Sequence, residues 1–357
     1  MMMQAHKEQT KKLGVVPVCD ICKKKKEITS NCDVCKQSYC ESCTQKHNTN
    51  EATKEHLQAS FGGTKIQESD IEQCRNVLGE YKATHYKHTP TTVPGDDKGA
   101  ACTLGMVILP DGRLIVIDNR YKSLKLFNSD RYTYAFRRNF THEPRGIAAI
   151  SGKEIAITFA DKHAVRMFLV REGSFEETGK FKVEEKPFCI SYSEGNEKSL
   201  AIEVGEGKYG AIIITNLSGD LLKEISGYTR RFGLFTGNTI RLVHDHGKQL
   251  LFIADLTRDC INCVDYDGAI VWKVEVDSPR GIHHHGNTLF IASKSKNAIY
   301  QMKTELGAEE LPIVYLLLDS GDGIIEPRFL SYNAQAKRLA VEVAGNLIQT
   351  YNCSNRK

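Results

Sequence analysis

Short apolar runs alternate with turn residues from about residue 100 to the end of the chain. The segment Leu114–Asp118 is apolar at four of its five positions and follows a Pro-Asp-Gly turn at Pro110–Gly112. A run of this length bounded by turn residues is typical of a β-strand. No helical period persists in this region. The pattern therefore predicts a mainly β fold for this part of the chain.

The runs form a repeating unit of a strand, a turn and a second strand. Four such units begin at Gly105, Pro144, Pro279 and Pro327. The prolines Pro144 and Pro187 are 43 residues apart, Pro187 and Pro279 are 92 apart (twice 46), and Pro279 and Pro327 are 48 apart. A period in the forties with about four strands per unit is typical of a β-propeller. Adding a unit near Thr239 predicts six blades.

The last repeat contains only three evident strands and ends near Cys353. Propellers close when a strand from the other end of the domain completes the last blade, because closure removes an exposed sheet edge. We expect the segment near Thr84–Thr92 to supply this strand.

A short helix is predicted before the propeller. Ser69 and Glu72 fit a capping box, and Ile71, Cys74, Leu78 and Tyr81 form one apolar stripe at helical spacing. The stripe covers about two heptads, whereas a coiled coil needs three or four. Packing on a neighbouring domain is therefore favoured over dimerisation.

Composition and charge exclude several classes of protein. The net charge is +4, with 15 Lys and Arg against 13 Asp and Glu in residues 1–100 and 33 against 31 in the rest. A basic surface must therefore come from arrangement rather than from excess charge. The start is polar, without an apolar secretion segment, and no run approaches the ~18 apolar residues of a membrane helix. We expect a cytoplasmic protein, with the nucleus as an alternative, and no membrane partner.

Six of the twelve cysteines cluster near the N-terminus, followed by two histidines. The candidate metal ligands are Cys19, Cys22, Cys32, Cys35, Cys40, Cys43, His47 and His56. A Cys-x2-Cys pair brings two thiolates to one ion, and tetrahedral zinc takes four such ligands. Eight ligands fill two closed sites with no position for water or substrate, so the pattern predicts two structural Zn2+ ions. Spacing alone leaves the pairing open.

The cysteine and histidine run resembles the B-box of the tripartite-motif (TRIM) family. The resemblance implies a cross-brace, with Cys19, Cys22, Cys40 and Cys43 on one zinc and Cys32, Cys35, His47 and His56 on the other. Cys22 is typical of a type 1 B-box, whereas many type 2 B-boxes have histidine there. The predicted domains are a B-box-type finger at 14–60, a linker with a short helix at 61–83, and a propeller at 84–357.

The propeller repeats resemble NHL repeats. They share Pro-x-Gly-Ile, followed by a β-rich run that ends in Asp, best seen at Leu114–Asp118 and Leu251–Asp255. With the B-box, the chain is similar to TRIM-NHL proteins over nearly its full length. It departs from them in two features: no cysteine precedes Cys19 to form a RING finger, and the long coiled coil is absent.

Basic residues recur at two positions of the predicted blades. The loops that lead into the first strand and the loops between the second and third strands lie on the same face of a blade. The candidate binding residues on this face are Lys122, Arg145, Lys162, Lys208, Arg258, Arg280, Lys296 and Arg328. They predict a ring that binds an anionic ligand. The alternative is pairing with local acids such as Asp161, Glu206 and Asp259.

Other clusters in the propeller argue against catalysis. Successive strand residues point to opposite faces, so His283, His284 and His285 cannot converge on one ion, and Cys260 and Cys263 cannot meet. The carboxylates of Asp118 and Asp255 are expected to accept bonds from turn amides. The sequence contains no nucleophile elbow, phosphate loop or HExxH motif. No catalytic residue or small-molecule substrate is predicted.

The favoured function is a zinc-binding protein-interaction adaptor that binds a protein partner through the propeller face. The resemblance implies a place in ubiquitin or immune-type signalling. One alternative is RNA binding by the propeller, with Tyr121, Tyr209 and Phe329 placed for base stacking. The other is a ubiquitin ligase or ligase component acting through the B-box.

Overall fold

The structure is a computed structural model that describes residues 28–32, 37–40, 63–65, 79–97, 99–150, 152–195, 197–205, 210–225, 240–305, 312–344 and 346–356. The chain divides into two compact units, Met1–Thr64 and Lys65–Lys357. The predicted zinc ligands and most of the predicted helix lie outside the described residues, apart from the backbone of Cys32 and Cys40.

The first unit contains an antiparallel hairpin of β1 (Ile28–Cys32) and β2 (Gln37–Cys40). Cys32 lies opposite Gln37, and Cys40 lies opposite Ile28. The backbones of the two cysteines are therefore at opposite ends of the hairpin, roughly 13 Å apart at the rise of a strand. A third short strand, β3 (Gly63–Lys65), spans the boundary between the two units.

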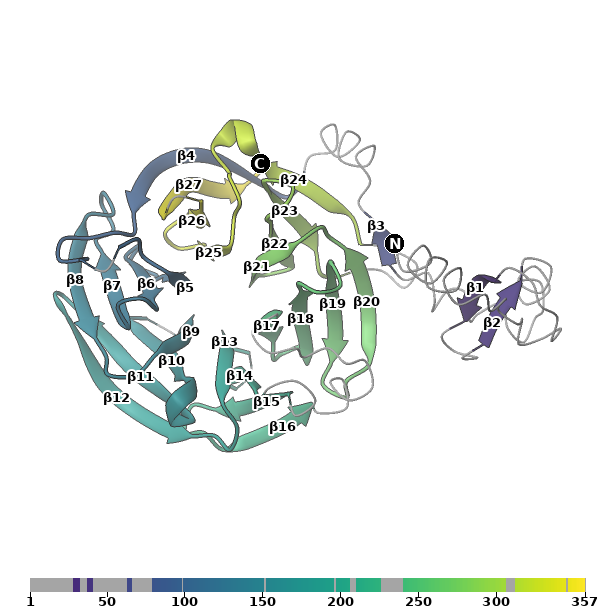
Figure 1. Ribbon diagram of the computed structural model, residues 1–357, viewed down its shortest axis with the longest axis horizontal. Coiled ribbons are helices and arrows are strands. Elements are labelled where there is room, and N and C mark those ends of the chain that lie inside the picture. The colour runs from purple at the N-terminus through teal and green to yellow at the C-terminus, as the bar shows by residue number, and fades with distance from the viewer. Residues whose placement is uncertain are drawn as a thin grey trace. The chain divides into compact units, whose positions relative to one another are not determined.

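The second unit is a six-bladed propeller, as the repeats predicted (Figure 1). In each blade neighbouring strands pair in antiparallel fashion. The first three blades contain β5 (Thr103–Ile108), β6 (Leu114–Asp118), β7 (Ser123–Phe127) and β8 (Tyr134–Asn139); β9 (Pro144–Ala149), β10 (Glu154–Phe159), β11 (Ala164–Arg171) and β12 (Ser174–Lys182); and β13 (Pro187–Ser193), β14 (Ser199–Val204), β15 (Ala211–Asn216) and β16 (Leu221–Ile225).

The other three blades follow the same plan. They contain β17 (Ile240–Asp245), β18 (Leu250–Asp255), β19 (Cys260–Asp265) and β20 (Ile270–Glu275); β21 (Pro279–His285), β22 (Thr288–Ser293), β23 (Ala298–Lys303) and β24 (Val314–Leu318); and β25 (Phe329–Asn333), β26 (Arg338–Val343), β27 (Leu347–Asn355) and β4 (Tyr81–Pro90). Single 3-10 turns, η1 (Ala160–Lys162) and η3 (Ser320–Asp322), lie in two connections.

The innermost strand of each blade packs against the innermost strands of its two neighbours, which closes the ring between β25 and β5. Each blade is covered on both faces, so the second strands β6, β14 and β22 bury every residue. This arrangement explains why each of these strands contains a continuous apolar run, at Leu114–Ile117, Leu200–Ile202 and Leu289–Ala292, rather than an alternating pattern.

Close packing between blades explains why the Pro-x-Gly-Ile motif contains a glycine. A Cβ on Gly146 would lie 2.4 Å from the carbonyl oxygen of Phe188 in the next blade. A Cβ on Gly281 would lie 3.0 Å from the carbonyl oxygen of Arg328. The glycine therefore lets the innermost strands of neighbouring blades approach closely.

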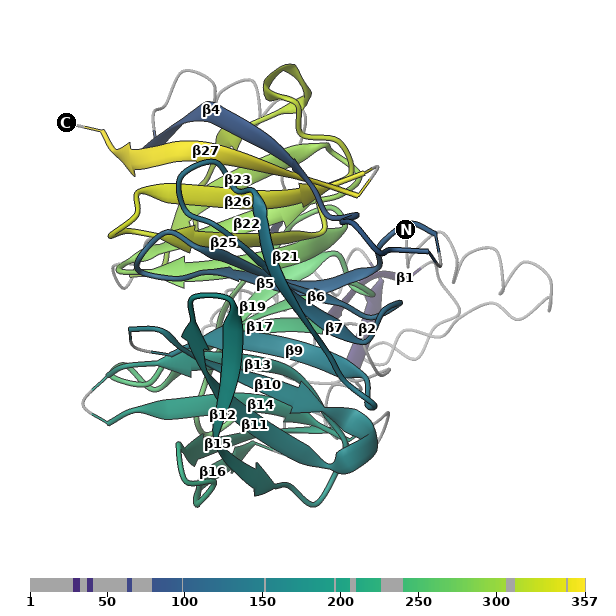
Figure 2. The same cartoon turned by 90° about the vertical axis from the view of Figure 1, so that its left-hand side faces the viewer.

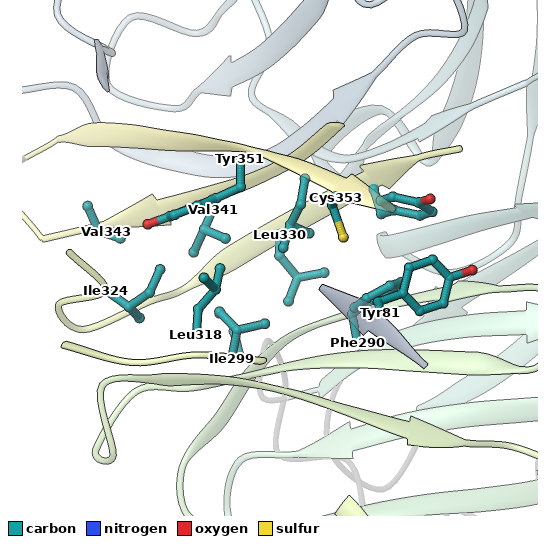
Figure 3. Packing of buried hydrophobic residues seen from close by; sticks show 13 residues of the cluster. Tyr81, Phe290, Ile299, Leu318, Ile324, Leu330, Val341, Val343, Tyr351 and Cys353 are labelled. Atoms are coloured by element: carbon teal, nitrogen blue, oxygen red, sulfur yellow. The ribbon is translucent and has the colours of Figure 1, made fainter. Parts of the chain in front are cut away.

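The last blade is closed by β4, which pairs along its whole length with β27 (Figure 2). The predicted closing strand is confirmed, and it begins at Tyr81. This residue was expected on the helix and is instead the first residue of β4. Its ring packs edge-on against Phe290 and Tyr332, with centroids 5.1 and 5.5 Å away (Figure 3). Burying this ring and pairing the strand outweigh the local helical pattern.

A buried charge cluster ties the segment after β4 to the first blade. The Lys125 ammonium lies 2.6 Å from an oxygen of Asp118 and 2.7 Å from an oxygen of Asp96, and it donates to the carbonyl of Thr91. Arg137 also contacts Asp96, at 2.7 Å. Buried charges persist only when paired, so this cluster holds the connection in place.

Candidate functional site

The innermost strands of all six blades line an axial cavity of about 570 Å3. Each of these strands runs from the face that carries the loops between second and third strands, here called the bc face, to the opposite ab face. The wall combines apolar side chains, such as Ile147, Ile190 and Leu330, with polar ones. Polar groups gather near the two ends of the cavity.

Glu203 is the buried acid near the bc-face end. It lies in β14, lines the cavity and is 1% exposed. Its Oε2 accepts a hydrogen bond from the backbone N–H of Cys189 at 3.3 Å, and its Oε1 has no hydrogen-bond partner in the described parts of the chain. Burial raises the pKa of Glu203 to about 7, against a smaller lowering by the charge of Arg241.

Arg241 lies on β17 beside this acid. Its guanidinium carbon lies 4.9 Å from the ring centroid of Phe329, on β25 two blades away. The intervening blade has Gly281 at the same repeat position, so no side chain stands between them. Arg241 and Phe329 are half-buried, so solvent reaches this end of the cavity.

Sequence reasoning did not single out Glu203 or Arg241 as site residues. Cys189, Arg241 and Phe329 occupy the repeat position where Gly146 and Gly281 stand in other blades. Where the glycine is missing, a side chain enters the cavity. Departure from the repeat was therefore the signal that could have located them.

A comparison of repeat positions also marks Glu203. It occupies the position of Glu342 in the last blade and lies one residue before the position of Asp118 in the first. Asp118 contacts the Lys125 ammonium, and Glu342 contacts the Arg328 guanidinium. No such ion pair is formed by Glu203 among the described residues.

The seven predicted basic residues that the structure describes lie on the bc face as expected, in the loops or at the starts of the innermost strands. Lys208 lies outside the described residues. Five of the seven are paired with carboxylates: Lys122 and Arg145 with Glu143 at 3.9 and 3.1 Å, Arg258 with Asp255 at 3.1 Å, Lys296 with Asp277 at 3.4 Å, and Arg328 with Glu342. Lys162 and Arg280 form no ion pair with the described residues. The ring is therefore largely neutralised.

Histidines gather toward the ab face. His244 is buried between two serine hydroxyls, with its Nδ1 3.1 Å from Ser191 Oγ and its Nε2 3.0 Å from Ser199 Oγ. Burial lowers its pKa to about 3. Burial likewise lowers the pKa of His283 to about 3 and that of His284 to about 4. These rings are neutral at physiological pH.

The other candidate residues of the propeller lie within single strands: His283, His284 and His285 in β21, and Cys260 and Cys263 in β19. The Nε2 of His284 is hydrogen-bonded to Thr304 Oγ1 at 3.3 Å, whereas the ring of His285 packs on that of Tyr332. The thiols of Cys260 and Cys263 are free. Within the described parts of the chain, no three His, Cys, Asp or Glu side chains are grouped so that they could hold a metal.

Asp118 and Asp255 cap turns as predicted. Asp118 Oδ1 accepts from the backbone N–H groups of Cys102 and Arg120 at 3.1 and 3.0 Å. Asp255 Oδ1 accepts from those of Thr257 and Arg258 at 2.9 and 3.1 Å. Each carboxylate also pairs with a basic side chain through its other oxygen.

No protein-family model matches this chain, and no curated protein matches its sequence. Its fold is similar to that of virginiamycin B lyase from Staphylococcus aureus, with a TM-score of 0.50 and 12% identity over 76% of this chain and 99% of that one. A streptogramin B lyase matches with a TM-score of 0.48 and 14% identity over 77% of this chain and 94% of that one. Likenesses at this identity show the propeller fold alone.

Among the described residues, the structure contains no helix of the length and apolarity needed to cross a membrane.

Proposed function

We propose that this chain is a protein-interaction adaptor that holds a segment of its partner at the bc-face end of the axial cavity. The observation that carries the proposal is the cavity itself, which combines apolar side chains with convergent polar groups. A concavity of several hundred Å3 with polar groups fixed on a rigid framework is typical of binding sites. The closing pair of β4 and β27 supports the proposal, because a closed ring holds the lining strands rigidly.

The charge distribution favours a protein partner over RNA. Binding to a nucleic-acid backbone depends on cations that neutralise phosphates. Most of the predicted cations already contact carboxylates, such as Arg328 with Glu342. A polyanion would have to displace these contacts, whereas a peptide need not.

In this proposal the N-terminal region is a B-box-type module with two structural zinc ions, and it supplies the adaptor with a second binding surface. The spacing of the cysteines and histidines supports it. The hairpin register also supports two separate metal sites: thiolates on one zinc lie within ~4 Å of each other, and the backbones of Cys32 and Cys40 are far apart.

A pull-down with the full chain, with and without nuclease, tests the adaptor proposal. Leu104→Trp should place a large ring in the cavity near the bc face, because Leu104 lines it. We expect nuclease-resistant partners that are lost with this variant. Leu222→Trp, on the exposed outer strand β16, is the matched control and should keep them.

The surrounding face is tested by the double variant Lys162→Glu and Arg280→Glu, because these two cations form no ion pair within the described chain. Lys337→Glu, in the turn between β25 and β26 on the ab face, is the control. Partners that survive both Leu104→Trp and the double variant would show that another surface binds. Nuclease-sensitive recovery would favour RNA instead.

A further inference from the structure

The bc-face end of the cavity contains an unfilled hydrogen-bonding position. Glu203 Oε1 is buried and has no hydrogen-bond partner among the described residues. A buried polar atom without a partner is costly, and native structures keep few of them. Glu203 lines the cavity, so a ligand in the cavity can supply the missing donor.

The groups around Glu203 limit which ligand fits. The backbone N–H of Cys189 already donates to Oε2. The positive charge of the Arg241 guanidinium also acts on Glu203 and lowers its pKa. A guanidinium carries five N–H donors, and the Nε–H of Arg241 forms no hydrogen bond with the described residues, so it can donate to a ligand. Apolar side chains such as Leu104 and Phe329 also line the cavity.

Three ligand chemistries can be compared at this position. A carboxylate would be attracted by Arg241 but would face the acceptor oxygen of Glu203. An ammonium group would satisfy Glu203 but would face the guanidinium. A carboxamide satisfies both, because its N–H donates to Oε1 while its oxygen accepts from Arg241.

We propose that this end of the cavity binds the side-chain carboxamide of a glutamine or asparagine on the partner, between Glu203 and Arg241. The inference rests on the proposed adaptor function and names the chemistry that the partner presents. The carboxamide belongs to a peptide, because apolar side chains further along the cavity can contact the peptide residues next to it.

Titration calorimetry of the full chain at pH 8.5, where Glu203 is ionised, tests the proposal with capped Gly-Gly-X-Gly-Gly peptides in which X is Gln, Met or Glu. Methionine matches glutamine in length and lacks the amide. Hydrogen bonds to charged groups make the Gln peptide bind about tenfold or more tightly than the Met and Glu peptides. Equal affinity for all three peptides would overturn the proposal.

Glu203→Gln supplies a sharper test. The new amide presents a donor where the carboxylate presented an acceptor, so the preference reverses and the Glu peptide binds more tightly than the Gln peptide. Glu224→Gln, on the exposed outer strand of the same blade, keeps the wild-type preference. An unchanged preference in Glu203→Gln would show that the amide binds elsewhere.

Two further outcomes separate the alternatives. N-acetylglutaminamide binding as tightly as the Gln peptide would show that the site takes a small free amide, which would overturn the peptide assignment. Partners that are lost with Leu104→Trp but unaffected by Glu203→Gln would overturn the carboxamide inference and leave the adaptor function standing. Partners unaffected by Leu104→Trp would overturn the adaptor site itself.

Discussion

At the scale of single residues, the molecule keeps two glutamates buried at the same repeat position in different blades. Burial raises the pKa of both Glu203 and Glu342 to about 7. Glu342 is compensated by Arg328, whose Nε donates to it at 3.0 Å. Glu203 has only one backbone donor. The propeller thus tolerates an incompletely satisfied acid at the cavity, and perturbed acids of this kind cluster at functional sites.

The first prediction concerns the pH dependence of Glu203. A raised folded-state pKa contributes stability that is fully present below the unfolded value near 4.3 and is lost as pH rises through about 7. Glu203→Gln removes this loss. The free energy of unfolding of the variant should therefore rise relative to wild type by up to about 3 kcal/mol between pH 5 and pH 8. Urea denaturation at several pH values measures it, and exposed Glu224→Gln should show no such trend.

The second prediction has the opposite sign and concerns His244. Its folded-state pKa is lowered to about 3, whereas an unfolded histidine titrates near 6.5. Its contribution to stability is fully present above pH 6.5 and is lost as pH falls toward 3. Wild type should lose up to about 3 kcal/mol relative to His244→Gln between pH 7 and pH 4. A constant difference in urea midpoints would contradict burial of a neutral ring; exposed His88→Gln is the control.

At the scale of elements, the closing strand decides whether the ring exists. The β4 strand comes from the start of the second unit and pairs with β27 near its end. Tyr81 anchors its beginning in a cluster with Phe290, Tyr332, Tyr351 and Cys353 (Figure 3). The Tyr81 N–H also donates to Gln301 at 2.7 Å, so the fifth blade helps to hold a strand of the sixth.

The third prediction tests this anchor. Tyr81→Ala removes a ring that is 4% exposed and leaves a cavity between the last two blades. The free energy of unfolding should fall by about 3–5 kcal/mol. Lys82→Ala, at the exposed next position of the same strand, should have little effect in the same thermal or urea melts. Removing residues 80–95 should destabilise the propeller further, because the sheet edge of β27 is exposed.

At the scale of the whole molecule, six small sheets form one domain because each blade covers its neighbours. The hydrophobic clusters lie between adjacent blades, as where Leu126 of the first blade packs with Phe168 of the second. No blade can bury both of its faces alone. A closed ring covers both faces of all six blades, and the cavity along its axis is a consequence of that closure.

The fourth prediction concerns the other unit. Elemental analysis of the purified full chain should find two zinc ions per chain, because eight thiolate and imidazole ligands fill two tetrahedral sites. Replacing Cys22 and Cys35 together with Ser should reduce the ratio to near zero, while the propeller should still unfold cooperatively. A ratio near one in the unmodified chain would contradict the two-site assignment.

Much of the architecture follows from the sequence alone. The prolines and strand–turn–strand units specify six blades, since each repeat has the length of four short strands and the turns that connect them. The shortage of one strand in the last repeat specifies closure by a distant segment. The alternation rule for strands is enough to keep His283, His284 and His285 from meeting at one metal. These features depend on local pattern and on chain connectivity.

Only the tertiary structure decided what the basic residues do and where the cavity chemistry lies. Arg328 pairs with Glu342 across a sheet, and Arg145 pairs with Glu143, so the expected positive ring is mostly neutral. Arg241 reaches Phe329 only because an intervening blade has a glycine at that position. The contact of Arg241 with Phe329 joins two blades, and the energies of all three contacts depend on distances and burial set by the folded ring. No spacing along the chain contains that information.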